Sequence, residues 1–439
     1  AGNQNVGIGT DSLKLNAAAD NTAVGYLSLA ANTTGTNNNA IGANALDANT
    51  TGSHNVAIGK DALGAHTTGD ENTSIGHNSM AVNTTGSNNT AIGSSALDAN
   101  TTASSNTAVG SAALGANTTG ALNTAVGSSA LANNTTGANN IAMGFAALQL
   151  NTTADNNVAL GYAAMNANTT GHSNTAVGDT ALDANTTGDS NVAIGRYALT
   201  ANTTADHNVA VGQSALGTNA QGASNVAIGH NALNTFNYGS AADTYNVAVG
   251  RGALEADTTG VQNVAVGGLA LSTNTTASNN TALGHFALKL NTTGATNTAV
   301  GGAALAANTT ASYNTGVGYA ALNANTTGAN NNAVGYYAMV GNTEGSSNVA
   351  FGSYAMDAST VGSDNTAIGH SALGAQTTAS HNTAVGYASL VLATTGHSNV
   401  GVGKNAGAAI SEGFKNTMIG YAAGDTTTIG DYNIVIGSE

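Results

Sequence analysis

The sequence predicts an all-β protein, a parallel β-solenoid (a β-roll) of about 26 coils that share one seventeen-residue repeat. A glycine that closes an Asn-x-x-Val/Ile-Gly segment recurs from Gly9 to Gly437, giving 26 glycines and 25 intervals. Of these intervals 23 equal the step from Gly42 to Gly59, the first is one residue shorter, and the one from Gly229 to Gly250 is four longer. Asn stands four residues before every one of these corner glycines, and Leu or Met four residues after 23 of the 25 that have such a residue. Repetition at a fixed short period is typical of solenoid folds.

The segment before each corner glycine is predicted to be a strand, because one coil is too short for a helix pair and no coil shows a helical apolar period. We expect two short strands per coil, joined by turns. In the coil that ends at Gly195, alternation places Val192 and Ile194 on one face, which we expect to be the interior, and Ala193 on the other. The corner glycine is expected where the backbone needs a positive φ or a close approach.

The Asn before each strand is predicted to stack on its equivalent in the next coil, forming an amide ladder that bonds the backbone of the turns. The representative members of this predicted structural ladder are Asn21, Asn55, Asn106, Asn157, Asn208, Asn263, Asn314, Asn365 and Asn416.

Composition and charge exclude several classes of function. The chain has 7 basic and 22 acidic residues and a net charge of −15, so nucleic acid is not an expected partner. Cys is absent and no apolar run is long enough to span a bilayer. Position 1 is Ala rather than Met, which fits a processed chain or a fragment of a longer one.

Catalysis is not expected. The ten His residues lie at variable positions, and no coil gathers them with carboxylates. Asp47, Asp98, Asp183 and Asp357 recur in turns without forming an unbroken column, so a calcium-built roll is not expected. We therefore predict a protein that is not an enzyme and has no cofactor, no metal site and no catalytic residue.

Two polar patterns have alternative interpretations. The Asn-Thr-Thr tripeptides, such as those beginning at Asn32 and Asn117, match the glycosylation sequon, but turn geometry explains their period better. Their two Thr are adjacent and face different ways, so they do not form the two-dimensional Thr grid expected of an ice-binding surface. Ice or crystal-surface binding is kept as a third hypothesis.

The variable corner positions carry most of the 13 Tyr residues, whose rigid amphipathic rings suit contact surfaces. The candidate surface-contact residues are Tyr26, Tyr162, Tyr197, Tyr319, Tyr336, Tyr354 and Tyr387.

Residues 1–402 are predicted to form regular coils, with a four-residue loop insertion within 234–245. Residues 403–439 diverge, because Gly407 and Gly424 replace the Leu, and are expected to form a cap or a junction. Few large apolar side chains occur in each coil, so the margin of stability for a lone chain is thin. We therefore predict a homo-oligomer, most simply a trimer, with filament subunits as the alternative.

The segments from Asn55 to Gly59 and from Asn191 to Gly195 resemble the head repeats of trimeric autotransporter adhesins, the YadA-like left-handed β-roll. Related repeats are similar to those of other bacterial surface proteins and of phage tail fibres. The resemblance covers essentially the whole chain, although these coils are longer, with the excess in the Ala-Asn-Thr-Thr-Gly connection. It implies a left-handed roll and a homotrimeric surface fibre that binds host or matrix components.

The predicted function is that of an extracellular structural or adhesive fibre on a cell surface, most simply a bacterial outer surface. It would form a stiff rod or filament that mediates attachment or contact with a host, a matrix or a neighbouring cell. The second hypothesis is a phage or virus tail-fibre shaft, located on the virion.

Overall fold

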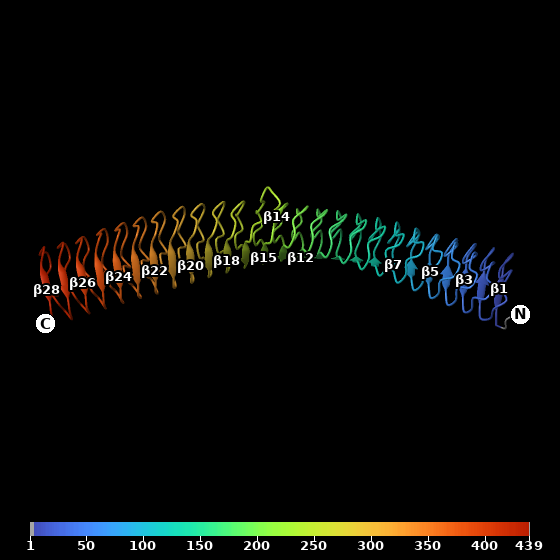
Figure 1. Ribbon diagram of the computed structural model, residues 1–439, viewed down its shortest axis with the longest axis horizontal. Helices are drawn as coiled ribbons and strands as arrows, with labels where there is room; N and C mark the ends of the chain where they lie inside the picture. Colours follow the sequence, from blue (N-terminus) through green and yellow to red (C-terminus); the bar gives the residue numbers. More distant parts are fainter. Residues whose placement is uncertain (1–3, 439) are drawn as a thin grey trace. The chain divides into compact units, whose positions relative to one another are not determined.

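A computed structural model describes residues 4–438. It confirms the predicted fold class: the chain is an all-β parallel β-solenoid with about 25 turns of about 17 residues, and the described residues contain no helix. The chain divides into two compact units, residues 1–223 and 224–439, each of which is a stack of such turns. Within each unit the strands follow one another in chain order (Figure 1).

Every regular coil contributes one three-residue strand to its unit. The strands of the first unit are β1 (Val6–Ile8), β2 (Thr22–Val24), β3 (Asn39–Ile41), β4 (Val56–Ile58), β5 (Thr73–Ile75), β6 (Thr90–Ile92), β7 (Thr107–Val109), β8 (Thr124–Val126), β9 (Ile141–Met143), β10 (Val158–Leu160), β11 (Thr175–Val177), β12 (Val192–Ile194), β13 (Val209–Val211) and the two-residue β14 (Gly222–Ala223).

The second unit has the same organisation. Its strands are β15 (Val226–Ile228), the two-residue β16 (Ala242–Asp243), β17 (Val247–Val249), β18 (Val264–Val266), β19 (Thr281–Leu283), β20 (Thr298–Val300), β21 (Thr315–Val317), β22 (Asn332–Val334), β23 (Val349–Phe351), β24 (Thr366–Ile368), β25 (Thr383–Val385), β26 (Val400–Val402), β27 (Thr417–Ile419) and β28 (Ile434–Ile436).

Neighbouring strands pair in parallel and in register, so that equivalent residues of successive coils lie side by side. Ala193 of β12, for example, pairs with Ala176 of β11 and with Ala210 of β13. Adjacent strands in a sheet lie about 4.8 Å apart. Each sequence column therefore becomes a row of side chains repeated at that spacing.

The expectation of two strands per coil is wrong, because the remainder of each coil is a series of turns. These turns are nevertheless bonded from coil to coil. In the coil after Gly59, the backbone N–H groups of Leu63 and Ala65 donate to the carbonyls of Ser79 and Ala81, at 3.1 and 3.0 Å. Hydrogen bonds between coils thus continue around the turn and are not confined to the sheet.

The turns depend on residues with positive φ. Gly59 has a φ of 133°, and a Cβ there would overlap the backbone of Gly76, so the corner position admits only glycine. In the same coil Asp61, Leu63 and Glu71 have φ values of 57°, 51° and 60°. Left-handed backbone costs an ordinary residue about 1 kcal/mol and is worst for β-branched side chains. This explains why the buried aliphatic position after the corner is Leu or Met and never Val or Ile.

The predicted orientation of the strand is wrong, and the structure has the opposite one. Ala193 is fully buried, whereas Ile194 is 40% exposed and Val192 is partly exposed. Side chains two apart in a strand share a face. Because Asn191 is buried, Ala193 must also face the interior, and the two larger side chains face outward.

The interior is filled by the Leu or Met after the corner and by small residues around it. Ala198 and Leu199 are both fully buried, as is the strand-centre Ala193. Where a strand centre is glycine, at Gly316, an added Cβ would contact the Leu305 side chain at 3.3 Å. The Leu305 side chain and the Ala321 carbonyl oxygen, which is 3.2 Å from that Cβ, together limit the size of the strand-centre residue, which is why Ala recurs there.

The divergent coils near the C-terminus exchange large and small residues at these same positions. Gly407 and Gly424 take the left-handed Leu position, with φ values of 58° and 65°. Met418, at a strand centre, and Ile410, in place of the Asn of Asn-Thr-Thr, are both fully buried. A Cβ added to Gly407 would approach both side chains, at 3.0 Å from Ile410 and 3.3 Å from Met418. The space left by the missing Leu is filled from two other columns.

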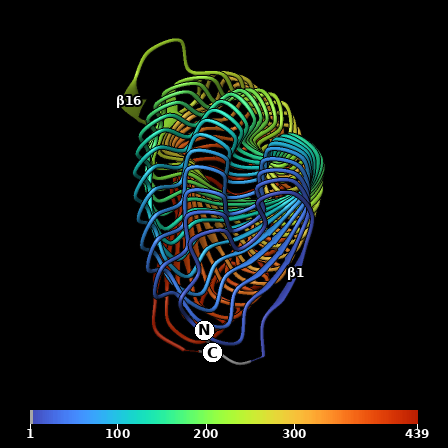
Figure 2. The ribbon, with the colours of Figure 1, turned by 90° about the vertical axis from the view of Figure 1, so that its right-hand side faces the viewer.

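The four-residue insertion projects from the second unit. Phe236 is fully buried at the position that Asn holds in regular coils, and its ring stacks on that of Tyr238 at 6.4 Å. The following loop, which carries β16, stands clear of the surrounding coils (Figure 2). A buried ring therefore anchors a loop that leaves the pairing of β15 with β17 intact.

The observed strand orientation predicts a large effect on stability for one substitution and almost none for its neighbour. Ala193→Val should destabilise the solenoid by about 1–3 kcal/mol, because it overpacks a buried position. Val192→Thr, which introduces the residue found in β11, should change stability by less than about 0.5 kcal/mol. Thermal unfolding followed by circular dichroism, with hydrogen exchange of the β12 amides, measures both. A larger loss of stability for Val192→Thr than for Ala193→Val would instead indicate that Val192 faces the interior, as first expected from the sequence.

Met418→Ala should open a cavity in the divergent coils and cost about 2–5 kcal/mol of local stability. Met143→Ala is the matched control, because Met143 lies on the outward side of β9 and is 44% exposed. Protease resistance of the C-terminal coils should fall only in the first variant. Equal resistance of the two variants would contradict this account of the packing.

Candidate interaction surfaces

The nine asparagines proposed from the sequence as a ladder are all at most 1% exposed, so they lie inside the coil and not on a binding surface. Each amide joins two coils. The Asn55 Nδ2 donates to the carbonyl of Gly69 at 3.0 Å, and its Oδ1 accepts the backbone N–H of Asn72 at 3.0 Å. The side chain thus satisfies two backbone groups of the turns that the sheet cannot reach.

A second amide ladder, which the sequence analysis did not identify, runs through the Asn of the Asn-Thr-Thr tripeptides. The Asn100 Nδ2 donates to Asn83 Oδ1 at 3.1 Å and to the carbonyl of Ala103 at 3.0 Å. Asn32 and Asn117, the sequon examples, are fully buried. An attached sugar could not be accommodated there, so the tripeptide has a structural role. Its fixed recurrence, coil after coil, was the signal that could have revealed it.

Two ionisable residues replace Asn in the second ladder. The His66 Nε2 donates to the Gly69 carbonyl at 2.7 Å, and burial lowers the pKa of the imidazole. Asp257 accepts the backbone N–H of Gly260 at 3.0 Å and the Asn274 Nδ2 at 3.2 Å. Its Oδ2 is buried without a partner among the described residues, and burial raises its pKa to about 8. Both side chains are therefore neutral parts of the interior at pH 7.

Of the two Thr residues after this Asn, the first uses its hydroxyl to bond the backbone of the next coil. The Thr67 hydroxyl donates to the carbonyl of Thr84 at 3.0 Å, and the same bond recurs between most regular coils. The next residue, Thr68, is exposed. One Thr column is thus engaged in the backbone and the other stands alone, which weakens the ice-binding hypothesis.

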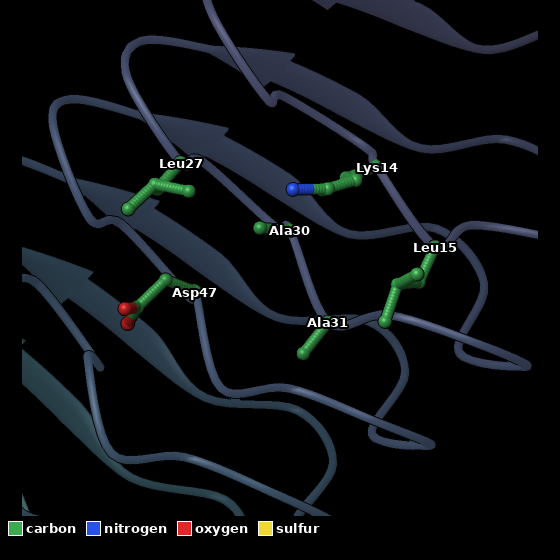
Figure 3. A pocket seen from close by; sticks show the side chains of 6 residues that line it. All are labelled: Lys14, Leu15, Leu27, Ala30, Ala31 and Asp47. Atoms are coloured by element: carbon green, nitrogen blue, oxygen red, sulfur yellow. The ribbon is translucent and has the colours of Figure 1, made fainter.

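The turn aspartates Asp47, Asp98, Asp183 and Asp357 are partly buried, and desolvation raises the pKa of each. Asp47 lines an open hollow of about 350 Å³ together with Lys14 and Leu15 (Figure 3). No group of three His, Cys, Asp or Glu residues suited to a metal ion occurs within residues 4–438. The lining of this hollow is aliphatic except for one basic and one acidic side chain, Lys14 and Asp47. Its described residues include no nucleophile paired with a general base.

The outward side of the sheet forms the first extended surface, which we call the aliphatic row. In each unit it consists of the last residue of each three-residue strand, which is Val, Ile, Leu, Met or Phe. In the first unit Ile41, Ile58 and Ile92 are 42%, 37% and 38% exposed, and Phe351 in the second unit is 58% exposed. Contiguous apolar surface of this kind is uncommon on soluble monomers and marks interfaces.

The tyrosines proposed as contact residues all lie on the surface, between 37% and 59% exposed. Tyr162 stacks on Phe145 with ring centroids 5.6 Å apart, and Arg196 lies over the ring of Tyr197 at 4.4 Å. Tyr26 stands on the corner after β2.

The other four proposed tyrosines, all in the second unit, form one cluster with Tyr337 and His370, which were not proposed as contact residues from the sequence. The complete cluster is Tyr319, Tyr336, Tyr337, Tyr354, His370 and Tyr387. The spacing of the corner glycines was sufficient to predict it, because the corner positions of successive coils must lie side by side.

The chain matches no protein-family model, and no curated protein is significantly similar to it. The likeness to YadA-like head repeats therefore rests on the Asn-Val-Ala-Ile-Gly segments and on the solenoid they form. No helix among residues 4–438 has the length and apolar character needed to cross a bilayer.

The buried acid in the second ladder predicts a pH dependence with a definite sign. Above pH 4 Asp257 ionises in the unfolded chain but stays protonated in the fold until about pH 8, so its contribution to stability falls across that range. Asp257→Asn should therefore raise the melting temperature at pH 7 and flatten its decline between pH 4 and 8. His66→Asn is the matched substitution with the opposite pH dependence. It should stabilise the fold only as the pH falls below the pKa of an ordinary His, because the unfolded chain then binds a proton that the buried imidazole does not. Melting curves at several pH values that show no such divergence would contradict both assignments.

Proposed function

We propose that this protein is an extracellular fibre subunit that assembles with copies of itself and mediates attachment, without enzymatic activity. One observation carries the proposal: every three-residue strand of the solenoid turns a large aliphatic or aromatic side chain outward, where a single chain leaves it partly exposed. A row of this kind has the same geometry along its length and is suited to a partner with the same repeat, which is a second copy.

The number of subunits follows from the resemblance to trimeric adhesin heads and not from the single chain. In a trimer the three aliphatic rows would face a common axis and exclude water from the side chains that the thin interior does not bury. At roughly 25 cal/mol for each Å² of apolar surface removed from water, such a contact would add to the stability of every coil. The proposed assembly thus supplies the apolar burial that one coil lacks.

Attachment is supported by the remaining surfaces. The corner positions outside the sheet vary from coil to coil while the backbone stays constant, so one fibre can present different chemistry along its length. A cell surface is the proposed location, with a phage or virus tail-fibre shaft as the alternative. Immunogold electron microscopy of the source cells and of their phage particles separates the two.

The proposal predicts that charge on the aliphatic row will separate the subunits. The combined Ile58→Lys, Ile75→Lys and Ile92→Lys variant should shift the assembly toward single chains of 42.4 kDa, because three buried ammonium groups would meet at the interface. Sedimentation equilibrium measures the mass. The control is Thr51→Lys, Thr68→Lys and Thr85→Lys, which adds the same charge at exposed turn positions and should leave the mass unchanged.

A wild-type chain that sediments as a monomer at micromolar concentration would overturn the proposed assembly. Dissociation of both variants to the same extent would show that charge alone, and not the aliphatic row, controls the mass.

A further inference from the structure

The cluster of rings in the second unit extends into a longer feature, which we call the aromatic stripe. Tyr319 and Tyr336 stack with centroids 5.9 Å apart, and His370 and Tyr387 stack at 5.5 Å. Lys404 continues the row, with its ammonium 5.8 Å from the ring of Tyr387 and 5.8 Å from that of Tyr421. The stripe therefore runs without a break across seven consecutive corners.

In the middle of the stripe the first corner residue after Gly352 is Ser353, and the ring of that coil is supplied by the second corner residue, Tyr354. Tyr337 and Tyr354 stack at 6.0 Å, while Tyr336 meets Tyr354 at an interplanar angle of 77°. The stripe thus presents rings in two orientations. Each is held by its neighbours on a rigid backbone, which lowers the entropy lost when a ligand binds.

The chemistry of the stripe differs from that of the aliphatic row. Its corner positions, from Tyr319 to Ala422, hold only Tyr, His, Ser, Lys, Asn and Ala, with no aliphatic side chain larger than Ala and no carboxylate. Tyr319, Tyr336 and Tyr387 are 53%, 46% and 54% exposed. Such a surface combines ring surface with hydrogen-bonding groups, so it can contact both the apolar and the polar parts of an amphipathic ligand.

These properties match a chain of sugar rings. The C–H groups of a pyranose pack against the exposed parts of aromatic rings, its hydroxyls bond to Tyr, Ser and Asn, and successive coils repeat these groups at a rise of about 4.8 Å. The net charge of −15 on the protein would repel a polyanion, whereas a neutral chain meets no such barrier.

We propose that the aromatic stripe binds a neutral linear polysaccharide along its length. This inference deepens the proposed function, on which it rests, by naming the class of partner to which the fibre attaches.

Affinity electrophoresis of the intact protein tests the proposal, with β-glucan, xylan or dextran as neutral probes and alginate as the polyanionic probe. We expect at least one neutral probe to retard the protein more than alginate does. Because Trp is absent, tyrosine fluorescence reports the interaction directly and should change on binding. The combined Tyr336→Ala, Tyr354→Ala and Tyr387→Ala variant should lose about tenfold or more in affinity, since truncated Tyr contacts are commonly dominant ones.

The matched control is Tyr26→Ala with Tyr162→Ala, which removes exposed rings of the first unit and should bind as the wild type does. Equal loss in both variants, stronger retardation by alginate, or no retardation by any neutral probe would overturn the polysaccharide site. If the wild type still forms its oligomer in that last case, the proposed fibre stands. A fall in sedimentation mass in the triple variant would instead identify the stripe as a subunit contact and overturn the proposal.

Discussion

Two columns of buried amides hold successive coils together, and the rest of the fold depends on them. The turns of each coil direct backbone N–H and carbonyl groups inward, where no water and no strand can meet them. A buried polar group without a partner costs about 1–3 kcal/mol. Asn55 and its equivalents satisfy the groups at one side of the interior, and Asn100 and its equivalents do so at the other.

This requirement explains why the interior is narrow and why large side chains appear outside it. Two amides occupy much of each coil, which leaves room for one Leu or Met and small residues. The Leu must also adopt a left-handed backbone, so β-branched residues are excluded from the one large interior position. They occur on the outward side of the strand, where they suit an extended backbone and stay partly exposed.

The period of the sequence was enough to predict the coil, its length and the row of Asn before each strand. The side of the strand that faces inward was predicted wrongly, because size and hydrophobicity were given more weight than alternation. The burial of Asn191 and the alternation along the strand together require that Ala193 be inside. The aromatic stripe was only half predicted, since Tyr337 and His370 gain their meaning from rings in the adjacent coils.

Exceptions to the columns show what the fold tolerates. Asp257 and His66 keep the ladder geometry as neutral groups, whereas Ile410 abandons it and fills space instead. Substitutions in the interior thus succeed when another column compensates, as Met418 does for Gly407 and Gly424.

Most side chains at the two corner positions after each glycine are partly or fully exposed, and their backbone is fixed by bonds to adjacent coils, so these positions tolerate more variation than the interior does. A substitution at a corner position changes the surface of one coil and leaves the packing of the interior unchanged. Duplication of a whole coil would lengthen this surface by one pair of corner residues without changing the strand register of the other coils. Substitution at the corners and duplication of coils can therefore change the exposed surface of this solenoid with little effect on its stability.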